Sequence, residues 1–149
     1  MSKKNQEHKM KRLAALSRCD LGYLSDPDGN PVTGDKKVWL NTGKAFLRAL
    51  ARDLELSEFK VWANPGGIAV NGESILMGMW GEGNGIFVEL VQEIGGCGCV
   101  MYRDIIGMKD YTGGRNRWIG VCKFESMSYD SLLTEFKELI HQRTYAVTA

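Results

Sequence analysis

The chain is poor in histidine and has no long apolar run, and each shortage argues against a class of protein. Only two of the 149 residues are histidine, His8 in a basic segment and His141 within a helical pattern. Because histidine is the commonest general base near neutral pH, the chain offers little for acid–base catalysis. The longest apolar stretches, Ser74–Trp80 and Ile86–Val91, are far shorter than the roughly 20 residues of a membrane-spanning helix. We therefore expect neither a membrane span nor a membrane partner.

Cysteine is also scarce. The chain contains Cys19, Cys97, Cys99 and Cys122, and its N-terminal residues lead into charged residues rather than the apolar core of a secretion signal. We therefore expect a cytoplasmic protein that keeps its cysteines as thiols. Cys97, Cys99 and Cys122 offer thiolates to a metal, but Cys-x-Cys is not the usual spacing of a zinc knuckle. No metal and no other cofactor is predicted.

The formal net charge is only +1, so the whole protein projects no strong field toward nucleic acid. The charge is unevenly placed, because residues 1–18 contain six lysines and arginines and one glutamate. Lys11 and Arg12 in this segment are candidates for contact with nucleic acid or with an acidic protein surface. Such basic runs are usually only solvated, so the segment decides nothing by itself.

Hydrophobic periodicity predicts helices near both ends of the chain. In the basic segment 1–18, apolar side chains at mostly helical spacings predict an N-terminal helix. Residues 20–37 gather glycine, proline, asparagine and aspartate, which predicts a long surface loop. Capping residues such as Ser128, together with apolar stripes, predict two further helices over residues 41–56 and 128–143.

Residues 58–124 change to the pattern of an antiparallel β-meander. Short apolar runs bounded by turn residues predict the strands Glu58–Ala63, Ile68–Val70, Ser74–Trp80, Ile86–Val91 and Cys99–Ile106. Asn71-Gly72 suits a tight hairpin turn, although a bulge within one long strand is an alternative there. A short apolar segment from Trp118 to Phe124 ends the region.

The predicted fold is a single α+β domain over residues 1–149. Its antiparallel meander of four to five strands is flanked by N-terminal helices and a C-terminal helix. We expect the core to form on one face of this sheet, under the helices 41–56 and 128–143.

Two glycine-containing segments fall short of phosphate-binding motifs. Thr42-Gly43-Lys44-Ala45 lacks both the first glycine and the final hydroxyl of a P-loop. Gly81-x-Gly83-x-Gly85 lies between two predicted strands, whereas the dinucleotide fingerprint needs a following helix. The second segment is therefore predicted to be a hairpin loop.

The loop before Trp118 is the candidate binding site. Its arginines, amide and aromatic side chains suit contact with phosphate, bases or a protein partner, and its glycines let the backbone approach closely. The candidate binding residues are Arg103, Lys109, Tyr111, Arg115, Asn116, Arg117 and Trp118, with help from Lys11 and Arg12. The alternative is a solvated loop with Trp118 buried as a core anchor.

An enzyme is the main alternative to a binding protein. Asp104 and Asp110 lie in one segment with Arg103 and Arg115, and such carboxylates could serve a small hydrolase or nuclease. Surface ion pairing explains this spacing better, so no catalytic residue is predicted. A structural or regulatory protein that dimerises is a third possibility.

Two stretches in the middle of the chain resemble a class of known proteins. One is Gly66-Gly67-Ile68-Ala69-Val70-Asn71-Gly72-Glu73 with Gly78-Met79-Trp80, and the other is Met101-Tyr102-Arg103 with Met108-Lys109-Asp110-Tyr111-Thr112-Gly113-Gly114-Arg115-Asn116-Arg117-Trp118. In their general run of residues, rather than in a defined motif, they resemble poorly characterised small accessory proteins of phages, plasmids and integrative elements. They contain no motif with known chemistry, so the resemblance implies no catalytic residue.

The resemblance implies a non-enzymatic protein that acts by binding, as anti-CRISPR and antirestriction proteins do. Its implied partner is a host defence protein or nucleoprotein complex, or nucleic acid directly. The oligomeric state is left open.

We predict that no stoichiometric zinc copurifies with the protein from chelator-free buffer, because the thiols lack zinc-site spacing. Elemental analysis checks this. One zinc per chain that is lost when Cys97 and Cys99 are replaced by serine would contradict the prediction.

Overall fold

The computed structural model describes residues 3–17, 34–65, 72–92, 98–110 and 114–140. In chain order its elements are α1 (Lys3–Leu16), α2 (Gly34–Asp53), β1 (Glu58–Asn64), β2 (Glu73–Gly81), β3 (Asn84–Gln92), β4 (Gly98–Ile105), β5 (Arg117–Gly120), the 3₁₀ helix η1 (Val121–Glu125) and α3 (Tyr129–Lys137). The predicted α+β class is confirmed.

The five strands form one antiparallel meander in the order β1-β2-β3-β4-β5. The predicted hairpin loop is confirmed, because β2 and β3 are joined through Gly83, whose φ of 73° suits glycine. The predicted strand Ile68–Val70 and Asn71 lie outside the described residues. The predicted sheet region 58–124 is too long, because the chain leaves β5 at Gly120 and turns into η1.

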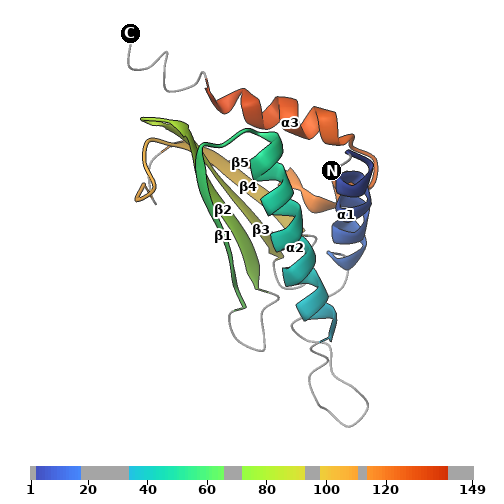
Figure 1. Cartoon of the computed structure of the whole chain (residues 1–149). Coiled ribbons are helices and arrows are strands. Elements are labelled where there is room, and N and C mark those ends of the chain that lie inside the picture. Colours follow the sequence, from blue (N-terminus) through green and yellow to red (C-terminus); the bar gives the residue numbers. More distant parts are fainter. Residues whose placement is uncertain (1–2, 18–33, 66–71, 93–97, 111–113, 141–149) are drawn as a thin grey trace.

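All three described α-helices lie on one side of the sheet (Figure 1). Helix α2 packs over β1 and β2. Helix α3 reaches β4, where the ring of Phe136 lies 4.9 Å from that of Tyr102. The main hydrophobic core fills the space between the helices and this face of the sheet, as the apolar stripes predict.

Helix α1 is part of this core, which the sequence interpretation did not expect. Met10 and Leu13 are fully buried, and Nε2 of Gln6 donates a hydrogen bond to the carbonyl oxygen of Phe46 at 3.0 Å. The basic residues Lys11 and Arg12 occupy its exposed side. The basic composition of the segment therefore describes only the outer side of a helix whose inner side is apolar.

Helix α2 begins at Gly34, seven residues before the predicted start at residue 41. The predicted loop 20–37 is therefore too long, and its residues 20–33 lie outside the described part of the chain. The turn-forming composition hid the start of the helix, although Trp39 is almost completely buried and its indole N–H donates to the carbonyl oxygen of Gly72 at 3.5 Å. Gly43 lets α2 approach β2 closely, since a Cβ there would lie 2.7 Å from Oγ of Ser74.

The cap of α3 is confirmed, because Oγ of Ser128 accepts a hydrogen bond from the backbone N–H of Ser131 at 3.1 Å. The helix runs from Tyr129 to Lys137, and residues 141–143 of the predicted helix lie outside the described residues. Within the described ranges, no helix is both long and apolar enough to cross a membrane.

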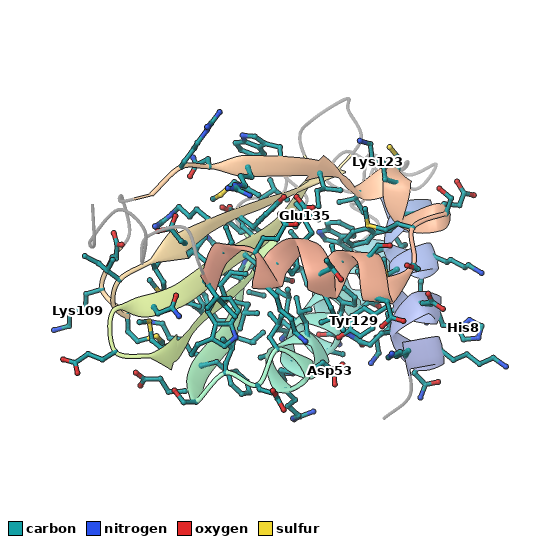
Figure 2. The ribbon with its side chains drawn as sticks, turned by 90° about the horizontal axis from the view of Figure 1, so that it is seen from above. His8, Asp53, Lys109, Lys123, Tyr129 and Glu135 are labelled. Atoms are coloured by element: carbon teal, nitrogen blue, oxygen red, sulfur yellow. The ribbon has the colours of Figure 1, made fainter. Side chains whose placement is uncertain are left out.

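Tyr129 joins the three helices. Its hydroxyl donates a 2.6 Å hydrogen bond to Oδ2 of Asp53 in α2, and its backbone N–H donates to Oε2 of Glu7 in α1 at 3.0 Å. Figure 2 shows Tyr129 and Asp53 beside one another. Burial and then the bond to Asp53 raise the pKa of the Tyr129 hydroxyl above its ordinary value, so the hydroxyl stays a donor.

We predict that Leu13→Ala destabilises the protein by about 2 to 5 kcal/mol, because it leaves a cavity in the core. Lys11→Ala, on the exposed side of the same helix, should change the free energy of unfolding by less than about 0.5 kcal/mol. Urea unfolding of both variants checks this. Equal effects would show that α1 is not a core element.

Candidate functional site

The second side of the sheet carries side chains that no described helix covers. Because side chains alternate along a strand, directly opposed residues share one side. One complete row across the five strands is formed by Trp62, Ile75, Glu89, Met101 and Trp118. We call the side of the sheet that bears this row the helix-free face. Its own small apolar cluster, centred on Met77, Met79 and Ile105, includes no residue of a described helix.

Trp118 is the most exposed large apolar side chain in the described part of the chain, at 60%. It stands at the β5 edge of the helix-free face, at the end of the row that starts with Trp62. Nζ of Lys60 lies 4.9 Å from the ring centroid of Trp62. The alternative interpretation of Trp118 as a buried core anchor is therefore wrong.

Arg103 is buried beneath this surface. It is only 3% exposed, its guanidinium lies 4.8 Å from the ring centroid of Phe87, and its Nη2 donates to the carbonyl oxygen of Asp110 at 2.8 Å. The carboxylate of Asp110 lies 3.9 Å from Nη1 of Arg103 and accepts a hydrogen bond from the N–H of Ile106. Arg103 therefore holds the loop after β4 against the sheet.

Glu89 lies near the middle of the helix-free face, on the central strand. Burial is the main cause that raises the pKa of Glu89 from 4.5 to about 8. A hydrogen bond with the side chain of Glu73 and the negative charge of Glu73 raise it further. Glu73 sits diagonally opposite on β2, because Glu89 pairs with Ile75. The side chain of Asn64 in turn donates to Glu73 at 3.4 Å. The two carboxyl groups therefore share a proton more readily than isolated carboxyl groups do, which lets them bond to each other.

The sequence interpretation missed Glu89. The sequence points to this residue only as the one carboxylate within the apolar run Ile86–Val91. Alternation of side chains along a strand places it on the same side as Phe87 and Val91. The partner Glu73 follows a turn, so only the strand register identifies the pair.

The predicted loop residues do not share one direction. Lys109, Arg115 and Asn116 are exposed, and Tyr111 lies outside the described residues. Arg117 pairs with Tyr102 and so faces the helices, whereas its neighbour Trp118 faces the other way. Of the two neighbours Arg117 and Trp118, only Trp118 therefore lies on the helix-free face.

Arg117 lies near a buried hydroxyl. Burial and then a 2.6 Å hydrogen bond to Glu135 raise the pKa of Tyr102, and Arg117 acts in the opposite direction. Its guanidinium therefore belongs to the contact between β4, β5 and α3, where Glu135 is seen in Figure 2.

The basic helix is far from the loop. Figure 2 shows His8 of α1 and Lys109 of the loop at opposite ends of the molecule. Lys11 and Arg12 lie one helical turn from His8. They cannot share a compact contact surface with Lys109, so the predicted surface consists of two separate regions.

The carboxylates of the enzyme alternative are also separated. Asp104 pairs with Ile86 on the helix-covered side, whereas Asp110 contacts Arg103 on the other side. No group of three or more potential metal ligands occurs among the residues that the structure describes. Cys97 and His141 lie outside that part, and Cys99 and Cys122 are half-buried.

Comparison of the chain with protein-family models, with curated proteins and with solved structures found no significant match. The function must therefore be argued from the surface itself. The resemblance to proteins of mobile elements stays a prediction.

We predict that Glu89→Gln is more stable than the wild type at pH 8 to 9 and equally stable near pH 4.5. The folded-state pKa is above the ordinary one, so folded Glu89 keeps a proton between pH 4.5 and about 8, and wild-type stability falls as pH rises through this window. Glutamine cannot ionise, so the stability of the variant does not decrease in this way as the pH rises. Thermal unfolding at several pH values checks this, with Glu138→Gln as the exposed control. Parallel curves for wild type and Glu89→Gln would contradict the prediction.

Proposed function

We propose that this chain is a non-enzymatic binding protein that engages a protein partner through the helix-free face. The observation that carries the proposal is Trp118, whose large apolar ring stays 60% exposed, whereas the side chains of the main core on the other side of the sheet are buried. Tryptophan is among the residues that most often dominate binding energy at protein interfaces. An exposed tryptophan held on a paired strand presents such an anchor with little loss of conformational entropy.

The surroundings of Trp118 suit a protein partner. The row from Trp62 to Trp118 has apolar side chains on both sides of Glu89, and Arg115 and Asn116 lie exposed just before β5. Aromatic and arginine side chains are the types that are enriched at protein interfaces.

Nucleic acid fits the same face less well. Binding of a strand requires cationic side chains along its path between stacking aromatic rings. The row from Trp62 to Trp118 contains no lysine or arginine, and Lys11 and Arg12 lie elsewhere. The row therefore suits a protein better than a phosphate backbone.

The biological setting that we propose is a mobile genetic element, with a host defence protein or nucleoprotein complex in the cytoplasm as the partner. This part of the proposal rests on the resemblance of the two middle segments to such accessory proteins. Inhibition of an anti-CRISPR or antirestriction type needs only occupation of a surface on the target, which a binding face without catalytic groups can provide.

We predict that the protein raises the transformation efficiency of a targeted plasmid in bacteria with an active restriction or CRISPR system. Trp118→Ala should abolish this effect, because loss of an anchor ring weakens binding by at least roughly tenfold. Lys11→Ala/Arg12→Ala is the matched control and should keep it. Pull-downs with nuclease treatment identify the partner in parallel.

Each outcome distinguishes one part of the proposal. No protection against any defence system would exclude the counter-defence setting. A partner that Lys11→Ala/Arg12→Ala loses and Trp118→Ala keeps would place binding on α1 instead. Concentration-dependent dimerisation that Trp118→Ala removes would identify the face as a contact between two copies of the chain.

A further inference from the structure

One end of the helix-free face is hollow. A cavity of about 350 Å³ lies between the start of β1, the β2–β3 hairpin and the residues that follow β4. The hairpin and the loop after β4 lie side by side at the upper left of Figure 1. Three separate parts of the chain therefore form the cavity.

The floor of the cavity is apolar and rich in methionine. Met79 and Met108 line it, and both belong to the small apolar cluster of the helix-free face. Gly85 makes room for this floor, since a Cβ there would overlap Sδ of Met79. Ile106, which is 53% exposed, adds a second apolar wall. Methionine adapts its shape to what it contacts, which suits a surface that receives a foreign side chain.

The rim of the cavity is acidic and open. The two charged residues that line it, Glu58 and Glu82, are both carboxylates and both exposed. Gly81 and Gly107 complete the rim, and a Cβ at either would meet no atom within 4 Å. The entrance is therefore wide, and its charge is complementary to lysine or arginine.

We propose that this cavity receives an apolar side chain of a protein partner, flanked by lysine or arginine residues that pair with Glu58 and Glu82. The inference rests on the proposed binding function, because the cavity belongs to the same face as Trp118. The apolar floor takes the side chain out of water, and the acidic rim selects its neighbours by charge. A segment with acidic flanks is rejected by like-charge repulsion.

The test uses three short synthetic peptides and the full-length protein labelled with ¹³C at the methionine methyl groups. One peptide carries leucine between lysines, the second carries leucine between glutamates, and the third carries glycine between lysines. The first should move the Met79 and Met108 methyl signals in a saturable way, and the other two should bind at least tenfold more weakly. The methyls of Met10 and Met127, on the other side of the sheet, serve as internal references.

Two variants address the cavity directly. Gly107→Phe should block the entrance and remove the shifts, because the position has open space for a side chain. Glu82→Lys should weaken binding of the lysine peptide severalfold, and Glu138→Lys, an exposed reversal on the helical side, should not.

The outcomes separate this inference from the proposed function. Equal shifts with the glutamate peptide, or binding that survives Gly107→Phe, would overturn the cavity assignment. If the lysine peptide does not bind at millimolar concentration while Trp118→Ala still loses its partner, the face binds by other contacts and only the cavity assignment fails. If the peptide binds as expected and Trp118→Ala has no effect, the cavity stands and the anchor is elsewhere.

Discussion

Tyr129 is buried where α1, α2 and α3 meet, and the placement of all three helices depends on its contacts. The hydroxyl bonds to Asp53, the backbone N–H to Glu7, and the ring lies 6.2 Å from that of Phe46. A buried phenol that lost its acceptor would leave polar groups unsatisfied in the core, which costs more than the bond itself contributes. This junction keeps the three described helices together on one side of the sheet, and no residue of a described helix belongs to the apolar cluster on the other side.

On the helix-free face, against which no described helix packs, buried polar groups bond to one another. Arg103 stacks on Phe87 and binds the Asp110 backbone, and Glu89 shares a hydrogen bond with Glu73. Removing one partner of such a buried pair would be strongly destabilising, so these contacts keep the side chains in place. Trp118 and the methionine-lined cavity are the places where apolar groups stay accessible, so the binding proposals concentrate there.

Much of the fold follows from pattern alone. The alternation in β1 and the turn glycine at Gly83 predict strands and a hairpin that the structure confirms, since both depend on local sterics. The start of α2 and the inner side of α1 were missed. In both cases tertiary burial, of Trp39 and of Leu13, outweighs a polar local composition.

The candidate site was harder to predict, for a physical reason. Arg117 and Trp118 are neighbours in sequence yet face opposite sides, and Arg103 looks like a surface cation until its burial is known. The composition of a segment shows which residue types could contact a partner. The side of the sheet that each side chain faces depends on the register of its strand. The cavity depends on three segments whose proximity only the register of the sheet establishes.

The bond from Tyr129 to Glu7 also joins two parts of the chain that are far apart in sequence. Every strand pairs with its sequence neighbour, so the sheet can assemble from local contacts as the chain is synthesised. Helix α1 precedes the sheet in the chain but packs against η1 and α3, which follow the sheet. Its contacts with α2 can form earlier, and η1 and α3 then complete the cover of its inner side.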